Sequence, residues 1–174
     1  MHRTSSNRPA PSTNREVKRV VLIGGGHAHV QVIKAFQSRP DNLNVTLIDL
    51  QSSAYYSGMV PGCVSGLYNL DQVQIALDSL ADLSGIEFVC GRVVGMSFKE
   101  NGGRQSVLVE ESDDDGNVVR REIPFDVVSV DIGSTTRDFT SIPGADRYTI
   151  STRPISDLVT RIQAEDGVIK EKIK

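Results

Sequence analysis

The sequence of 174 residues has few features of a nucleic-acid-binding, membrane-spanning or disulfide-stabilised protein. Its formal net charge is −3, so no excess of positive charge favours nucleic acid or an anionic membrane. No apolar run approaches the roughly 18 residues that suggest a membrane span. Its two cysteines, Cys63 and Cys90, have the spacing of neither a disulfide framework nor a zinc site. We therefore expect a soluble protein of a reducing, intracellular compartment.

The composition that is present suits one globular domain with a sizeable core. Hydrophobic residues make up 39% of the chain and charged residues 24%, which is ordinary for a soluble domain. Residues 1–17 differ, because they are rich in Ser, Arg, Pro and Asn and their first acid is Glu16. We expect a disordered leader there. The alternative is a mitochondrial or plastid transit peptide, which is also rich in Arg and Ser and poor in acids.

Residues 19–49 have the pattern of a β-α-β unit. An apolar run at 20–23 predicts a strand buried on both faces, and three glycines then break it. The helix that follows has apolar residues spaced three and four apart: Val30, Val32, Ile33 and Phe36. Arg39-Pro40-Asp41 ends this helix, and a second buried strand at 45–48 leads to Asp49. A β-α-β unit of about 30 residues has this length.

After this unit the pattern changes to short strands. Residues 50–70 predict a long loop with one helical turn, and long loops in compact domains are usually functional. A helix at 77–83 ends at Gly85. Short strand-like runs separated by turn signals then predict an antiparallel meander; the runs are residues 86–90, 92–98, 106–110 and 118–123, and the turns are 101–103 and 115–117. The acidic residues 113–117 predict a charged hairpin tip rather than a calcium loop, because their glycine is misplaced and no Glu closes the loop.

The last part of the chain contains one more buried strand and one more helix. The strand at 125–130 ends in Asp131-Ile132-Gly133-Ser134. Pro154 opens the helix, in which Ile155, Leu158, Val159 and Ile162 recur at helical spacing. We therefore predict an α/β fold, with a Rossmann-like domain over residues 18–150 that combines a parallel sheet with an antiparallel meander insertion.

The glycines of the first turn predict a pyrophosphate site. A strand that ends in glycines allows a tight turn, and the following helix directs its positive N-terminus and backbone N–H groups at an anion. Gly24 and Gly26 occupy the first two glycine positions of the pattern G-x-G-x-x-G, and His29 stands at the third. That third glycine normally lets helix and strand approach closely, so we expect different packing at His29.

Asp49 follows the second strand, where a carboxylate accepts hydrogen bonds from a ribose hydroxyl. An acid at this position disfavours a 2′-phosphate, so FAD or NAD is expected rather than NADP. The alternative is a solvent-exposed strand end. His27 and His29 raise the alternative of a metal site, but side chains two apart on a helix do not face each other and no third ligand is near in sequence. We expect no metal.

The glycine loop, the ribose acid, the meander and the strand ending in Gly133-Ser134 occur in an order that resembles the FAD domain of the pyridine nucleotide-disulfide oxidoreductase superfamily. There the last strand typically ends in A-T-G-S, so Asp131 and Ile132 depart from the pattern. The segment Tyr55 to Gly62 is similar to the flavin-proximal segment of type II NADH:quinone dehydrogenases. The three motifs together resemble the NADH dehydrogenase-like module that is fused to selenide, water dikinase in some proteins.

The resemblance implies contacts of the glycine loop with the FAD pyrophosphate, of Asp49 with the ribose, of residues 56–61 with the isoalloxazine and of Val93 or Val94 with the adenine. Gly133 and Ser134 would close over the cofactor, whereas Asp131 has an alternative role in capping the following turn. The implied cofactor-binding residues are Gly24, Gly25, Gly26, His27, Ala28, His29, Asp49, Leu50, Ser57, Met59, Pro61, Val93, Val94, Asp131, Ile132, Gly133 and Ser134.

The cysteines do not match the dithiol chemistry of this superfamily. Its disulfide reductases carry a C-x4-C pair near the flavin, and no second cysteine follows Cys63 at that spacing. A free packing thiol is expected at Cys63, with a redox role as the alternative. Cys90, within Phe88-Val89-Cys90, is expected in the core.

The resemblance implies the FAD-binding part of an NAD(P)H-dependent oxidoreductase with a quinone or another small electron acceptor. Residues 151–174 are expected to connect this domain to an NAD(P)H-binding domain that the sequence lacks, which implies a truncated chain and a docking surface or a homo-oligomer. Two alternatives stay open: a non-catalytic remnant that acts through interactions or has no activity of its own, and an NAD-binding module. No catalytic residue is implied.

Overall fold

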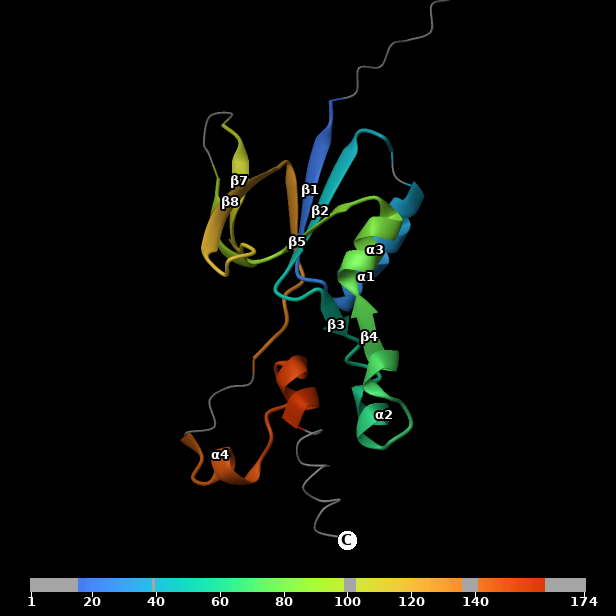
Figure 1. The fold of residues 1–174 in the computed structure, drawn as a ribbon, viewed down its shortest axis with the longest axis vertical. Coiled ribbons are helices and arrows are strands. Elements are labelled where there is room, and N and C mark those ends of the chain that lie inside the picture. The colour runs from blue at the N-terminus through green and yellow to red at the C-terminus, as the bar shows by residue number, and fades with distance from the viewer. Residues whose placement is uncertain (1–15, 39, 99–102, 136–140, 162–174) are drawn as a thin grey trace, which may run out of the picture.

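The computed structural model describes residues 16–38, 40–98, 103–135 and 141–161. A parallel sheet lies at the centre, with two helices on one face and a three-stranded antiparallel sheet on the other (Figure 1). Residues 1–15 of the expected leader at 1–17, most of the turn at 101–103 and the tail at 162–174 lie outside the described residues. No helix among the described residues is both long enough and apolar enough to cross a membrane.

The parallel sheet confirms the predicted β-α-β unit and extends it on both sides. Its spatial order is β5-β2-β1-β9, and its strands are β1 (Lys18–Ile23), β2 (Leu43–Asp49), β5 (Glu87–Cys90) and β9 (Val127–Val130). Val20 of β1 is in register with Val45 on one side and Val127 on the other. β1 is therefore central, with strands distant in sequence on its two sides.

The helices of the Rossmann unit are α1 (His27–Ala35) and α3 (Leu77–Ser84). Phe36 was predicted on the first helix, but α1 ends at Ala35 and Phe36 begins the 3-10 turn η1 (Phe36–Ser38). α3 ends as predicted at Gly85, whose φ of 60° is left-handed and favours glycine.

Alternation along the strands divides the core between the two faces of the sheet. Successive side chains of a strand point to opposite faces. Leu22 packs with the helices, in a cluster that also contains Val30, Ile33, Val45, Leu47, Leu77, Ala81 and Ile86. Val21 and Ile23 pack toward the antiparallel sheet, with Ile48, Val89, Val107, Val109, Ile123 and Phe125. The parallel strands are apolar throughout because both faces are covered.

The antiparallel sheet is the predicted meander, with corrected limits. It comprises β6 (Arg92–Ser97), β7 (Gln105–Ser112) and β8 (Val118–Phe125). Residues 86–90 were predicted as part of it, but residues 87–90 form β5 and pair in parallel with β2, because Phe88 and Val89 bury against opposite faces of the parallel sheet. The strand predicted at 125–130 begins later, since Phe125 still belongs to β8 and Asp126 separates it from β9.

The segment predicted as a loop at 50–70 contains more structure than expected. The predicted helical turn is α2 (Val60–Val64), but β3 (Ser53–Tyr55) was not predicted and pairs antiparallel with β4 (Gln74–Ala76). The 3-10 turn η2 (Leu70–Val73) precedes β4. Near the C-terminus, α4 (Ala145–Tyr148) is followed by helical residues 155–161, and these segments lie beyond the lower end of the parallel sheet (Figure 1).

Candidate dinucleotide-binding site

The carboxyl ends of three parallel strands meet at one edge of the central sheet. Gly24 follows β1, Asp49 ends β2 and Asp131 follows β9. From β1 the chain passes to β2 on one side, whereas β9 lies on the other side of β1. Ligands of open α/β sheets bind in the crevice outside the carboxyl ends of the strands, where the strand order reverses.

The glycine turn packs closely against Leu77 and Asp131, so larger residues do not fit. A Cβ on Gly24, whose φ is +92°, would lie 2.3 Å from the carbonyl oxygen of Asp131. A Cβ on Gly25 would lie 2.3 Å from Cδ1 of Leu77, and one on Gly26 would lie 2.3 Å from Oδ2 of Asp131. The turn is thus held between α3 and the end of β9, and its outer side lines the cavities described below.

Asp49 links the end of β2 to this turn. Its Oδ2 accepts a hydrogen bond of 2.6 Å from the Gly25 N–H, and its Oδ1 accepts one of 2.9 Å from the Gln51 N–H. The carboxylate is half-buried and lines the larger cavity. It therefore positions the glycine turn and at the same time faces the space in which a ribose was predicted.

His29 explains how the turn packs without the third glycine. The side chain is only 2% exposed, and its Nδ1 lies 2.6 Å from the carbonyl oxygen of Gly24. Because a carbonyl only accepts, Nδ1 carries the proton and donates. Nε2 lies 2.9 Å from Oγ of Ser129 in β9. The ring therefore fills the space between helix and strands with satisfied polar contacts.

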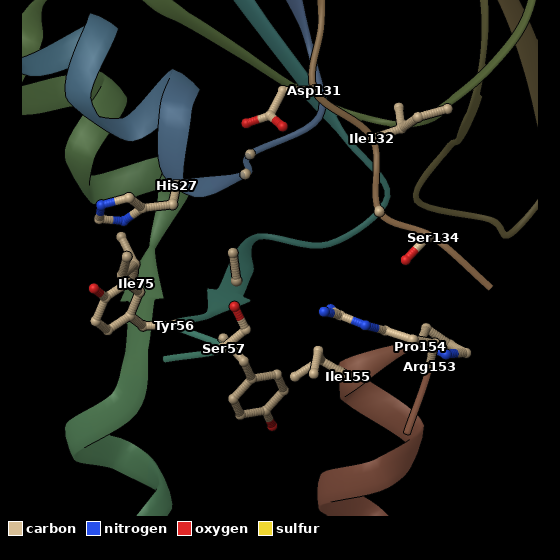
Figure 2. Close-up of a pocket in the computed structure, with 15 residues that line it drawn as sticks. His27, Tyr56, Ser57, Ile75, Asp131, Ile132, Ser134, Arg153, Pro154 and Ile155 are labelled. Atoms are coloured by element: carbon tan, nitrogen blue, oxygen red, sulfur yellow. The ribbon is translucent and has the colours of Figure 1, made fainter. Parts of the chain in front are cut away.

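The two histidines point in different directions. His27 is exposed and its ring lies 4.7 Å from the ring of Tyr56, in a tilted arrangement (Figure 2). His29 is buried behind the turn. Because one ring is exposed and the other buried, the two side chains are not placed to share a metal ion. His27 lines the candidate site.

Two adjoining cavities lie along this edge of the sheet. The larger has a volume of about 520 Å³, within the range of small-molecule pockets, and the smaller has a volume of about 280 Å³. Predicted residues that line one or both are Gly24, Gly25, Gly26, His27, Asp49, Leu50, Ser57, Val93, Asp131, Ile132, Gly133 and Ser134. The structure thus brings most of the predicted residues together.

Five predicted residues lie outside these two linings. Met59 lines a separate cavity of about 180 Å³ on the other side of His27 and Tyr56. The others are Ala28, His29, Pro61 and Val94, of which Ala28, Pro61 and Val94 are exposed. Of the two alternatives for the adenine contact, the structure places Val93 at the larger cavity.

Arg153 was not predicted as a site residue. It lines the smaller cavity together with Pro154 and Ile155, and its side chain extends from the C-terminal segment toward the region between Ser57 and Ser134 (Figure 2). Asp131 lies at the opposite side, next to the glycine turn (Figure 2). No motif surrounds Arg153, and its neighbour Pro154 indicated only the start of a helix.

Neither cysteine lines the two cavities. Cys63 is half-buried in α2, with Sγ 3.9 Å from the carbonyl oxygen of Asn69. The prediction that Cys90 belongs to the core is wrong, because its side chain is exposed. Cys90 is the last residue of β5, an outer strand of the parallel sheet, and lines a cavity with Leu50 and Arg92.

Comparison with known proteins finds a partial match in sequence and several in fold. No protein-family model matches the sequence. The chain is 24% identical over 125 residues to an NADH oxidase of Streptococcus pyogenes serotype M6, a match that covers 72% of this chain and 25% of that protein.

Two solved structures share the arrangement of strands and helices. The sulfide:quinone oxidoreductase of Aquifex aeolicus matches with a TM-score of 0.60 and 17% identity, over 88% of this chain and 32% of that one. NDH2 of Plasmodium falciparum in complex with NADH matches with a TM-score of 0.55 and 16% identity, over 77% and 26%. The chain thus spans about a quarter to a third of the length of these proteins. These similarities show that the chain has the same fold as the matched parts of these proteins.

Proposed function

We propose that this chain is the FAD-binding part of an NAD(P)H-dependent flavin oxidoreductase whose acceptor is a quinone or another small molecule. The observation that carries the proposal is the convergence of the glycine turn, Asp49 and the segment Asp131 to Ser134 on two adjoining cavities. The names of the similar proteins support it, since they include an NADH oxidase, a sulfide:quinone oxidoreductase and a protein in complex with NADH.

The residues at the site fit the parts of a flavin dinucleotide. The glycine turn offers backbone where a Cβ would collide, and the start of α1 favours the charge of a pyrophosphate. Asp49 would hold the adenosine ribose, and the backbone near Val93 would meet the adenine. Tyr56 and Ser57 would lie near the isoalloxazine.

The chemistry is divided between cofactor and protein. A bound flavin supplies two-electron redox chemistry, while the protein binds and orients it and limits access of water. The described residues form one dinucleotide fold, so the proposal assigns to them the binding of flavin and leaves the NAD(P)H contact outside them. The alternative of an interaction module without flavin is the outcome that the following experiment separates.

The experiment is a titration of the purified chain with FAD, NAD and NADP, followed by flavin fluorescence and thermal unfolding. We expect FAD to raise the melting temperature more than either nicotinamide dinucleotide, because a ligand that binds the folded state stabilises it by mass action. D49A should weaken FAD binding about tenfold, since a buried donor on the ribose loses its acceptor. D114N, at the exposed β7–β8 turn, is the control and should leave binding unchanged.

The titration has two results that would contradict the proposal. A preference for NAD over FAD would favour the NAD-binding module. A folded protein that binds none of the three ligands would favour the non-catalytic remnant, and its mass in solution would then show whether it associates with itself.

A further inference from the structure

The start of α1 has an unusual partner. Gly26 is its N-cap residue, no side chain of the helix caps it, and its first turn contains no acid. The carboxylate of Asp131 lies there instead, with Oδ2 3.4 Å from the backbone nitrogen of His29 and next to the backbone of Gly26. A negative charge at a helix N-terminus is stabilising. An acid that lies 102 residues away in sequence thus takes the role of a local cap.

The backbone of Asp131 is held in this position. Its N–H donates a hydrogen bond of 2.8 Å to the carbonyl oxygen of Ile23, which continues the pairing of β9 with β1. Its own carbonyl oxygen lies against Gly24. The residue therefore cannot withdraw as a whole, and its carboxylate leaves the glycine turn only by rotation of the side chain.

The position of this carboxylate conflicts with the binding of an anion. The glycine turn and the first turn of α1 supply the N–H groups that the proposed site directs at a pyrophosphate. Asp49 already accepts from the Gly25 N–H, and Asp131 lies on the His29 N–H. A pyrophosphate at this turn would meet the Asp131 carboxylate at short range, where like charges repel.

We propose that Asp131 determines the affinity of this site for phosphate-containing ligands, by occupying the start of α1 until such a ligand displaces its carboxylate. The inference rests on the proposed function and deepens it. Asp131 lowers the affinity for the pyrophosphate of a dinucleotide and stabilises the fold in its absence. Parts of a ligand that carry no phosphate are insensitive to it.

The test compares wild type with D131N, which keeps the shape of the side chain and removes its charge. We expect FAD and ADP to bind D131N about tenfold more tightly, and riboflavin, which has no phosphate, to bind both proteins equally. The ligand-free melting temperature should fall by about 1–3 °C, because the helix loses a favourable charge. A purely structural cap would lower the melting temperature and leave the affinity for FAD and ADP unchanged.

Controls keep the result interpretable. D114N removes one negative charge at an exposed turn residue that lines neither cavity, and should change neither affinity nor melting temperature. D131A is the second variant, should D131N fold poorly, and should show the same gain in affinity. Equal or weaker binding of FAD and ADP by either folded variant overturns the role of Asp131. Failure of wild type and variants to bind FAD overturns the proposed function, whereas a gain for ADP alone would still support the conflict of Asp131 with pyrophosphate.

Discussion

At the scale of single residues, His29 shows how a departure from a motif is accommodated. Its ring joins the carbonyl oxygen of Gly24 to the hydroxyl of Ser129, so one side chain holds together the glycine turn, α1 and β9. A glycine at this position would let the helix and the strand pack closely, because it has no side chain between them. The histidine instead fills that space and satisfies two polar groups, which makes it part of the core.

We expect H29A to lower the free energy of unfolding by about 3 kcal/mol, because it leaves a cavity and removes a hydrogen bond from the buried carbonyl oxygen of Gly24. Urea unfolding followed by circular dichroism measures this loss. H27A changes the same residue type at an exposed position two residues earlier, and should cost no more than about 0.5 kcal/mol. Similar losses for both variants would contradict the structural role of His29.

The sequence predicted those residues of the site whose chemistry is tied to a local pattern. Gly24, Gly26 and Asp49 follow from the spacing of a β-α-β unit. Arg153 does not, because its place at the cavity depends on how the C-terminal segment returns to the sheet edge. Cys90 was misplaced for a related reason: an apolar run indicates burial, but the run does not reveal that its last residue ends an outer strand.

At the scale of elements, the position of β9 depends on one ion pair at its start. Asp126 accepts hydrogen bonds from Nε and Nη2 of Arg19, at 3.1 and 2.9 Å, and from the Arg19 backbone N–H at 2.7 Å. The Asp126 N–H donates in return to the carbonyl oxygen of Arg19 at 2.9 Å. These contacts align β9 with β1 and thereby carry residues 131–134 to the glycine turn.

We expect D126N to lower the free energy of unfolding at pH 7 by about 1 kcal/mol, a small value because the pair lies at the surface, where solvent screens it. Hydrogen bonds from the Arg19 side chain, and then from its backbone, lower the pKa of Asp126 from 3.8 to about 2. Because the pKa of Asp126 is lower in the folded state, its ionised carboxylate stabilises the fold at pH values above 3.8. This contribution to the free energy of unfolding is lost as the pH falls toward 2.

The difference between wild type and D126N should therefore shrink between about pH 4 and pH 2. Unfolding curves over this range measure it. E110Q breaks the cross-strand pair of Glu110 with the largely exposed Arg120, and should cost less than D126N at pH 7. A difference between wild type and D126N that stays constant with pH would show that the ion pair does not hold β9.

The elements themselves were predictable where burial repeats along the chain. β1 and β2 are continuous apolar runs, α3 has apolar residues at helical spacing, and the meander has turn signals between its strands. β3 and β4 have three residues each, too few for any period, and they pair across α2 and η2. β5 was assigned to the wrong sheet because a short apolar run suits a parallel or an antiparallel partner equally.

At the scale of the whole molecule, the candidate site combines distant parts of the chain. The glycine turn and Asp131 lie at the sheet edge, and Arg153 approaches from the C-terminal segment (Figure 2). Arg153 and His27 both bring basic side chains to the smaller cavity, and Arg153 lies opposite the carboxylate of Asp131 (Figure 2). A guanidinium forms strong, charge-assisted hydrogen bonds with phosphate groups.

If FAD binds as proposed, R153Q should weaken the binding of FAD and ADP about tenfold, because a phosphate loses a cationic partner. R153K should retain part of the affinity. R147Q, in α4, is the matched control, because Arg147 is exposed, stacks on the ring of Tyr148 and lies outside the cavity linings. Fluorescence titration at constant ionic strength measures all four proteins, and equal affinity in R153Q would exclude Arg153 from phosphate binding.

The pairing of β1 with β9 also has a consequence for the order in which the protein is made. Contacts such as that of Arg19 with Asp126 join residues 107 positions apart, with the whole meander between them. Closing so long a loop costs chain entropy, and folds dominated by such contacts form slowly. During synthesis the glycine turn emerges long before Asp131. A nascent chain therefore has the glycine turn and Asp49 but still lacks the residues 131–134 that complete the site. A nucleotide would then bind only to chains that have completed this closure, and its uptake would report that folding is finished.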